Sequence, residues 1–249
     1  MNNLIFIAHR GESFDAPENT LQSINLAWKR DNDAVEIDAR LTADNKIAVI
    51  HDGNTNRVGG IYLKIASQSL DSLKKIDVGM YKGNQWTKAK IPSLEEVLDT
   101  IPKNKKLLIE IKCGPEILNQ LKFILADSNI KSDQIKLIGF SFTTLKKARA
   151  LFNEYEIFWL KRIERGFLNF WKLNQNEIID IALKNKFDGL NIKYSKFLDR
   201  NFVDKVKESG LKLFVWTVNE TEIAKKLIDY GVDGITSDRP NWLKKQIGL

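Results

Sequence analysis

Residues 4–38 read LIFIAHRGESFDAPENTLQSINLAWKRDNDAVEID and contain two short runs rich in β-branched and aromatic residues, 4–9 and 34–38. An amphipathic stretch, 20–30, separates them and has the spacing of a surface helix. Six further runs of the same kind follow, again with amphipathic stretches between them. They are LLIEIK (107–112), IKLIGFS (135–141), EIFWLK (156–161), FDGLNIKY (187–194), KLFVWTV (212–218) and VDGITSD (232–238). Such alternation predicts βαβ units and a parallel sheet.

Eight strand–helix units in one chain fit a (β/α)₈ (TIM) barrel of the α/β class better than an open sheet. A six-stranded doubly wound sheet would leave two strands over, and no dinucleotide-binding motif follows the first strand. The length of 249 residues is normal for an α/β barrel, so we expect a single domain over 1–249.

The composition points to an intracellular protein. The lone cysteine, Cys113, excludes an intramolecular disulfide and suits a reducing compartment. The N-terminus has four consecutive apolar residues, 4–7, with no basic segment before them. We therefore expect neither a signal peptide nor a transmembrane segment, and a cytoplasmic location.

The net charge of +7 favours a negatively charged partner. We interpret most of this excess as general surface charge, with a phosphate substrate or peripheral contact with anionic lipid accounting for the rest. The lysines form no continuous stripe and no recognition motif is present, so no nucleic-acid partner is expected. The oligomeric state stays open.

Two segments interrupt the strand–helix pattern. In 34–52 a second short strand follows the first after a polar turn, which predicts an antiparallel hairpin. Residues 53 to about 90 have no strong period and are expected to form an insertion at the C-terminal face of the barrel. A helix should follow it, with Ser93 as N-cap and Glu96 completing a capping box.

Polar side chains stand at the ends of three expected strands: His9 and Arg10, then Glu36 and Asp38, then Glu110 and Lys112. The C-terminal strand ends of a barrel meet at one face, and residues two apart in a strand point the same way. Three converging carboxylates suit one divalent cation, Mg²⁺ or Ca²⁺.

The hairpin brings the second histidine to the same place. A two-residue tip at 44–45 would set Asp38 opposite His51, and a tip that differs by one residue would shift this register but keep His51 next to Glu36 and Asp38. Two imidazoles near one metal site are typical of acid–base catalysis, and Arg10 with Lys112 would suit a phosphate oxygen. The alternative is that these residues are structural, with the carboxylates paired to lysines. Trp216 either packs at the rim or forms a wall of the substrate pocket.

These residues resemble the glycerophosphodiester phosphodiesterase family over nearly the whole chain. The matching motifs are HRG (9–11), PENT (17–20), EID (36–38), HDG (51–53), EIK (110–112), WTVN (216–219) and GVDGITSDRP (231–240). The resemblance implies a distorted TIM barrel with a small insertion after strand two.

The resemblance also implies roles for individual residues. Glu36, Asp38 and Glu110 would bind the cation, His9 and His51 would be the acid–base pair, and Arg10 and Lys112 would hold the phosphate. The expected reaction is metal-dependent cleavage of a small glycerophosphodiester into glycerol 3-phosphate and an alcohol. The stretch 159–175 departs from the family pattern.

Two alternatives are weighed against this function. A lysophospholipase D acting at a membrane surface would need an apolar groove, which GGIYLKIASQSL (59–70) and FLNFWKL (167–173) could supply. A binding module without activity would be expected to lack a histidine or a metal carboxylate, and none is missing.

Overall fold

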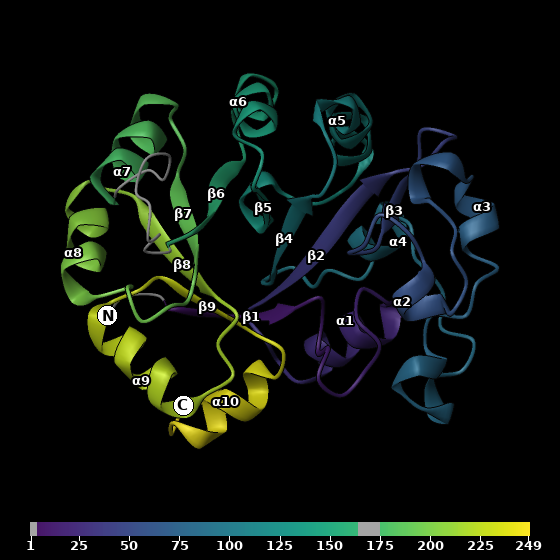
Figure 1. Cartoon of the computed structure of the whole chain (residues 1–249), viewed down its shortest axis with the longest axis horizontal. Coiled ribbons are helices and arrows are strands. Elements are labelled where there is room, and N and C mark those ends of the chain that lie inside the picture. The colour runs from purple at the N-terminus through teal and green to yellow at the C-terminus, as the bar shows by residue number, and fades with distance from the viewer. Residues whose placement is uncertain (1–3, 164–174) are drawn as a thin grey trace.

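The structure is a computed structural model that describes residues 4–163 and 175–249 (Figure 1). In this part of the chain, eight parallel strands form a sheet in the order β1-β9-β8-β7-β6-β5-β4-β2, and pairing of β1 with β2 closes it into a barrel. The strands are β1 (Ile5–His9), β2 (Ala34–Leu41), β4 (Lys106–Ile111), β5 (Ile135–Gly139), β6 (Glu156–Arg162), β7 (Gly189–Lys193), β8 (Lys212–Trp216) and β9 (Gly234–Ser237). Each expected run overlaps one of them, and the predicted (β/α)₈ barrel is confirmed.

Helices cover the outside of the barrel. They are α1 (Leu21–Lys29), α4 (Leu94–Leu98), α5 (Leu118–Asp127), α6 (Phe142–Leu151), α7 (Gln175–Lys184), α8 (Arg200–Glu208), α9 (Thr221–Tyr230) and α10 (Pro240–Gln246). The predicted capping box of α4 is present, because Glu96 N donates to Ser93 Oγ and Ser93 N donates to Glu96 Oε2. None of the helices in the described ranges is both long and apolar enough to cross a bilayer.

Each strand alternates between two environments. On β4, Leu107 and Ile109 pack against the outer helices, whereas Leu108 belongs to the apolar layer inside the barrel. Glu110, two residues further on, lines the cavity at the strand ends. The layer that fills the middle of the barrel consists of Ile7, Ala34, Leu108, Ile138, Phe158, Leu160 and Phe214. The period of two therefore places polar residues at the ends of an apolar interior.

The hairpin is present, but its predicted register is wrong by one residue. Strand β3 (Ile47–Val49) runs antiparallel to β2, with Ala39 opposite Val49. Ile50 N donates to the carbonyl oxygen of Asp38 at 2.9 Å, so Ile50 and not His51 lies opposite Asp38. The tip has three residues, 43–45, because Asn45 adopts φ 56°, the left-handed conformation that closes a longer turn.

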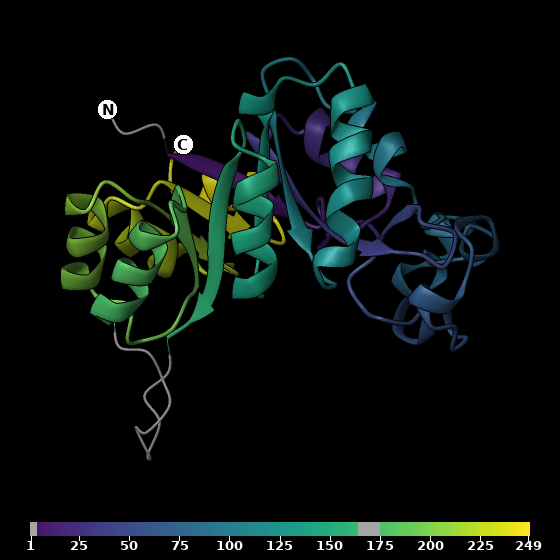
Figure 2. The same ribbon diagram turned by 90° about the horizontal axis from the view of Figure 1, so that it is seen from above.

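The insertion lies between β3 and α4 and stands beside the barrel at the end toward which β2 runs (Figure 2). It contains the short helices α2 (Asn56–Gly59) and α3 (Leu70–Leu73) and the 3₁₀ turns η1 (Ile65–Ser67), η2 (Met80–Lys82) and η3 (Asn84–Trp86). The apolar cluster beneath them consists of Ala48, Ile50, Val58, Ile65, Leu70, Leu73, Val78 and Ile91. The insertion thus has a small core that continues from β3. The 3₁₀ turns η4 (Pro115–Ile117) and η5 (Ser132–Gln134) precede α5 and β5.

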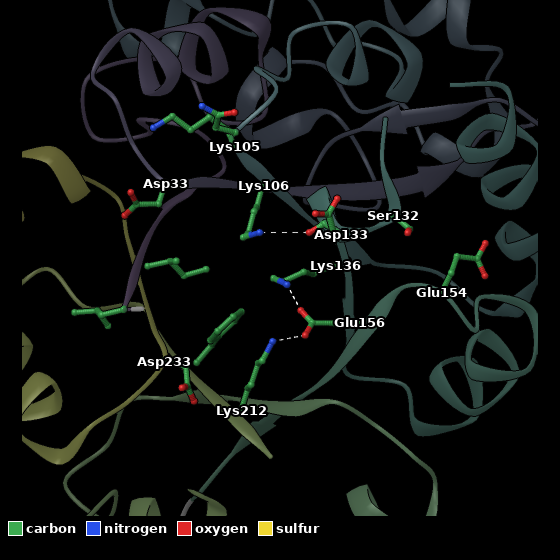
Figure 3. Close-up of a pocket in the computed structure, with 14 residues that line it drawn as sticks. Asp33, Lys105, Lys106, Ser132, Asp133, Lys136, Glu154, Glu156, Lys212 and Asp233 are labelled. Carbon is green, nitrogen blue, oxygen red and sulfur yellow. Dashed lines mark hydrogen bonds and ion pairs between the residues drawn. The ribbon is translucent and has the colours of Figure 1, made fainter. Parts of the chain in front are cut away.

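A cavity of about 700 Å³ opens at the other end of the barrel, where the strands begin (Figure 3). The lysines that line it are paired with neighbouring oxygens. Lys136 and Lys212 both donate to the Glu156 carboxylate, and Lys106 Nζ donates to the carbonyl oxygen of Asp133 at 3.4 Å. Burial lowers the pKa of Lys136, although Glu156 acts in the opposite direction. These contacts hold the lysines in place around the cavity at this end of the barrel.

Glu156→Gln is expected to lower the free energy of unfolding by about 1–3 kcal/mol, because Lys136, which is 5% exposed, loses its anionic partner. Glu156 keeps partial exposure, which reduces the effect below that of a fully buried pair. Urea unfolding at pH 7 measures it. The matched control is Glu222→Gln, which removes an exposed ion pair with Lys225 and should change stability by less than about 0.5 kcal/mol. Equal effects of the two changes would contradict the assignment.

Candidate active site

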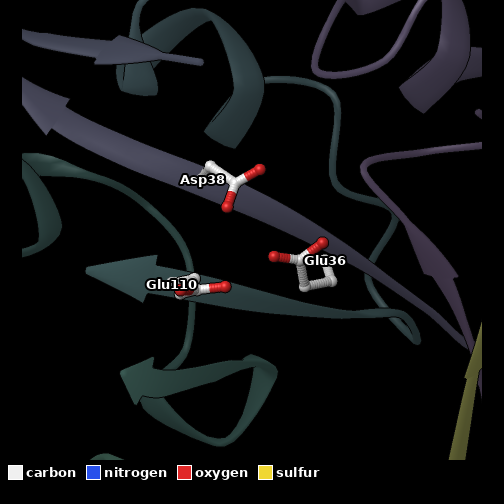
Figure 4. Close-up of side chains that lie close together, drawn as sticks. All are labelled: Glu36, Asp38 and Glu110. Atoms are coloured by element: carbon white, nitrogen blue, oxygen red, sulfur yellow. The ribbon is translucent and has the colours of Figure 1, made fainter. Parts of the chain in front are cut away.

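Three buried carboxylates come together at the C-terminal ends of β2 and β4 (Figure 4). Glu36 and Asp38 are two residues apart on β2, and Asp38 pairs in register with Glu110 on β4. Each carboxylate offers one oxygen, and these oxygens all lie within 4.8 Å of one another. The alternation of the strands and the parallel register between them produce this cluster.

The cluster carries more negative charge than its surroundings compensate. Burial raises the pKa of Glu36 well above its ordinary value, and the neighbouring Asp38 and Glu110 carboxylates add to the effect. Burial and Asp38 likewise raise the pKa of Glu110. Burial would also raise the pKa of Asp38, but Arg10 and Lys112 outweigh it and lower the pKa. Two cations therefore face three carboxylates.

The donor set fits a hard divalent cation. All three groups present oxygen ligands, which Mg²⁺ and Ca²⁺ prefer. Oδ1 of Asp38 is buried and has no hydrogen-bond partner among the described residues. Lys112 Nζ lies 3.6 Å from this oxygen, beyond hydrogen-bond distance. A buried carboxylate oxygen that accepts no hydrogen bond is costly, and a bound cation would reduce that cost.

Arg10 and Lys112 are the two cations beside the cluster. Arg10 Nε lies 3.3 Å from Asp38 Oδ2, and Lys112 Nζ lies 3.0 Å from Glu110 Oε1. Arg10 has φ 57° and Gly11 has φ 78°, so the chain turns sharply after β1. A side chain at Gly11 would also meet Ser23 of α1, because an added Cβ would lie 2.7 Å from the Ser23 Cβ. This explains the glycine in HRG.

Each histidine is held by a carboxylate. His9 Nδ1 lies 2.6 Å from Asp238 Oδ1, and His51 Nδ1 lies 2.7 Å from Asp52 Oδ1. Both contacts occupy Nδ1, so Nε2 is the second nitrogen of each ring. The aspartates select one tautomer and fix the ring orientation.

The two pairs differ in their electrostatics. Burial by itself would raise the pKa of Asp238, but hydrogen bonds from His9, Asn219 and Ser13 lower it to about 2. Asp238 is therefore ionised at neutral pH, with Oδ1 2.6 Å from His9 Nδ1. Burial lowers the pKa of His51. The Asp38 carboxylate acts in the opposite direction, but the pKa of His51 remains below its ordinary value. His51 is accordingly neutral at pH 7.

A chain of ion pairs ties the insertion to the site. Arg57 on α2 donates through Nε to Asp52 Oδ2 at 2.6 Å and through Nη2 to Glu18 Oε1 at 2.7 Å. Glu18 Oε1 also accepts from Arg10 Nη1 at 2.9 Å. Through these contacts the insertion helps to position both Arg10 and Asp52. Asn19, the next residue of PENT, donates to Asp38 Oδ2 at 2.7 Å, whereas Thr20 is the N-cap of α1.

These groups surround one cavity of about 250 Å³ at the C-terminal ends of the strands. It is lined by seven of the eight residues singled out in the sequence: His9, Arg10, Glu36, His51, Glu110, Lys112 and Trp216. The eighth, Asp38, contacts Arg10 and lies in the carboxylate cluster. Trp216 lines the cavity wall, where its ring meets Phe140 edge to face at 5.7 Å. The aromatic stretch FLNFWKL (167–173) and Trp171 lie outside the described residues.

Sequence reasoning did not single out the partners of the two histidines. Asp52 follows His51 directly in the sequence, so this pairing could have been predicted from their adjacency. Asp238 ends the expected run 232–238, and only barrel closure places β9 beside β1. No sequence feature indicated a role for Arg57. It lies in the insertion, where no periodic pattern predicts which residues face the barrel.

The chain is similar to known proteins over nearly its whole length. The model of the glycerophosphoryl diester phosphodiesterase family matches residues 9–242. The chain is 33% identical to YhdW of Bacillus subtilis over 245 residues, 97% of each chain. It is 30% identical to a glycerophosphodiester phosphodiesterase of Caldanaerobacter subterraneus subsp. tengcongensis over 244 residues, 96% of each chain.

A solved structure of an Oleispira antarctica phosphodiesterase, in complex with the product sn-glycerol-3-phosphate, is also similar. It has a TM-score of 0.86 and 28% identity, and the match covers 98% of this chain and 97% of that one. The barrel, the order of the motifs and the family match over 9–242 together mean that this chain belongs to the glycerophosphoryl diester phosphodiesterase family.

Proposed function

We propose that this chain is a metal-dependent glycerophosphodiester phosphodiesterase that releases glycerol 3-phosphate and an alcohol. The observation that carries the proposal is one cavity with the cluster of Glu36, Asp38 and Glu110 on one side and two carboxylate-held histidines beside it. We further propose that residues 1–249 act as one domain, since Arg57 of the insertion contacts groups that hold the site.

Glu36, Asp38 and Glu110 would hold one divalent cation, Mg²⁺ or Ca²⁺. When bound, it would supply Lewis-acid stabilisation of the negative charge that grows on the phosphoryl oxygens. Arg10 and Lys112 supply fixed positive charge for the same oxygens. Their side chains already lie against the carboxylates, so little reorganisation is needed when the phosphate arrives.

His51 is assigned as the general base, because the lowered pKa keeps its ring neutral. Nε2 takes the proton of the attacking hydroxyl as the new P–O bond forms. His9 is assigned as the general acid, because His51 takes the role of base and His9 Nδ1 lies 2.6 Å from the ionised carboxylate of Asp238. As the P–O bond to the leaving alcohol breaks, His9 Nε2 gives its proton to that oxygen. The attacking hydroxyl belongs to water or to the glycerol itself; in the second case a cyclic phosphate forms and water opens it.

The test is release of glycerol 3-phosphate from glycerophosphocholine with Mg²⁺ or Ca²⁺, with EDTA, and with EDTA followed by excess cation. We expect release with at least one cation, loss of at least about 99% of it in EDTA, and recovery on adding the cation back, since metal-site catalysis supplies several kcal/mol. The recovery step controls for irreversible damage by the chelator. Full activity in EDTA would contradict metal dependence, and no release under any condition would contradict the reaction.

A second candidate is a lysophospholipase D that meets its substrate at an anionic lipid surface. The insertion favours it, because Ile61, Tyr62 and Met80 are exposed and residues 53–90 hold seven lysines and arginines against two aspartates. The same assay with lysophosphatidylcholine decides between the two. A higher kcat/KM for the lysophospholipid than for glycerophosphocholine would favour the second candidate.

A further inference from the structure

Two buried polar side chains in the active-site cavity have no role in the chemistry described above. Asn191 on β7 and Thr236 on β9 are each 2% exposed, and both line the cavity. Oδ1 of Asn191 and Oγ1 of Thr236 have no hydrogen-bond partner within the described ranges. Buried polar atoms are nearly always paired, so two unpaired ones in one cavity call for a ligand that supplies the missing partners.

Their place in the barrel separates them from the carboxylate cluster. In the closed order of the eight strands, β7 lies directly across the barrel from β2, which carries Glu36 and Asp38. Strand β9 lies next to β1, and Thr236 is paired in register with Ile7, two residues before His9. A phosphodiester held at the carboxylates, Arg10 and Lys112 would extend one of its two substituents toward Asn191 and Thr236.

Most side chains around these atoms are apolar, with Arg162 the charged residue on this side of the cavity. Trp216 donates through Nε1 to the backbone carbonyl of Asn191 at 3.3 Å, and its ring meets that of Phe140. Ile138 and Leu160 also line the cavity, and the guanidinium of Arg162 lies 5.7 Å from the centre of the Phe140 ring. Largely apolar walls that carry these two polar atoms are complementary to a short carbon chain that carries hydroxyl groups. An amide and a hydroxyl can each donate and accept, as a hydroxyl ligand requires.

We propose that Asn191 and Thr236 bind the hydroxyl groups of the substrate's glycerol portion and so select phosphodiesters that carry free hydroxyls. The inference rests on the proposed phosphodiesterase function and deepens it, because it names the residues that recognise one half of the substrate. It assigns them to substrate selection and leaves the proton transfers to His9 and His51.

The experiment uses two substrates that differ by one group: glycerophosphocholine, and its analogue that lacks only the terminal glycerol hydroxyl. The analogue keeps the hydroxyl next to the phosphate, so an internal nucleophile remains available. For the unchanged protein we expect kcat/KM to be about 10- to 100-fold lower with the analogue, since a buried polar group is then left unpaired. In Thr236→Val or in Asn191→Leu, the kcat/KM values for the two substrates should differ by no more than about threefold. The variants should lose activity on glycerophosphocholine and keep their activity on the analogue.

A stability measurement separates substrate binding from a structural role. Because Oγ1 of Thr236 lacks a partner, Thr236→Val should leave the Tm of the free protein unchanged or raise it. The matched control is Thr144→Val, which removes a buried hydroxyl that donates to Ser141 Oγ at 2.9 Å and should lower the Tm.

The outcomes are distinguishable. If the unchanged protein hydrolyses both substrates equally well, the inference is overturned while the phosphodiesterase function stands. Equal losses on both substrates in both variants would also overturn it. If the unchanged protein hydrolyses neither substrate with Mg²⁺ or Ca²⁺, the proposed function fails and the inference fails with it.

Discussion

His51→Ala is expected to lower kcat for glycerophosphocholine by about 10²- to 10⁴-fold, the usual contribution of one positioned acid or base. The side chain lines the cavity, and Asp52 holds its Nδ1, so alanine removes the proton acceptor without removing a core residue. Steady-state rates with saturating Mg²⁺ or Ca²⁺ give the loss. An unchanged kcat would contradict a role for His51 in proton transfer.

A substrate with a better leaving group separates the two histidines. If choline is replaced by p-nitrophenol, the departing oxygen needs no proton, so loss of the general acid matters far less. The kcat of His9→Ala on the p-nitrophenyl ester should therefore approach that of the unchanged protein, whereas the kcat of His51→Ala should stay low. The control is Asp238→Asn, which keeps the His9 ring but removes its anionic partner, and should show a smaller deficit of the same kind. The reverse pattern of rescue would exchange the assigned roles.

Glu36→Gln is expected to remove activity almost completely and yet to stabilise the cation-free protein. A lost metal ligand removes a contribution of several kcal/mol to catalysis, which corresponds to about 10³-fold or more in rate. In the cation-free protein, burial and the adjacent Asp38 and Glu110 carboxylates disfavour the charged form of Glu36. Neutral glutamine relieves that repulsion, so the Tm in EDTA should rise.

The pH dependence of stability in the cation-free protein follows from the raised pKa of Glu36. The pKa of Glu36 is higher in the folded protein than in the unfolded chain, so its ionisation destabilises the fold above the unfolded value. In EDTA, the unchanged protein should therefore gain stability relative to Glu36→Gln as the pH falls from neutral through the raised pKa toward the ordinary value of 4.5.

Thermal unfolding at pH 5 and pH 7, with EDTA and with Mg²⁺ or Ca²⁺, measures both effects. The cation should raise the Tm of the unchanged protein by mass action and have little effect on Glu36→Gln. Glu222→Gln is the control for a loss of negative charge, because Glu222 is exposed and lies far from the cluster in the sequence. A lower Tm of Glu36→Gln in EDTA would contradict the assignment of these carboxylates as an uncompensated cluster.

Much of the site could be predicted because its residues follow strand periodicity. Glu36, Asp38 and Glu110 stand at fixed positions on two strands, and Lys112 follows β4 directly, so their common face followed from the period of two. The register of His51 could not be predicted to the residue, since the turn length depends on whether one residue takes the left-handed conformation. Asn45 does so, and the pairing shifts by one.

The sequence by itself determined the eight strands, the insertion after the second one and the set of polar residues at the strand ends, because these follow from local alternation and chain order. The tertiary structure alone decided which distant residues meet. Asp238 reaches His9 across 229 positions because closure sets β9 beside β1, and Asn191 faces the carboxylates because β7 lies across the barrel from β2. Closure of the barrel depends on the packing of all eight strands around one apolar interior, so it cannot be predicted from local sequence periodicity.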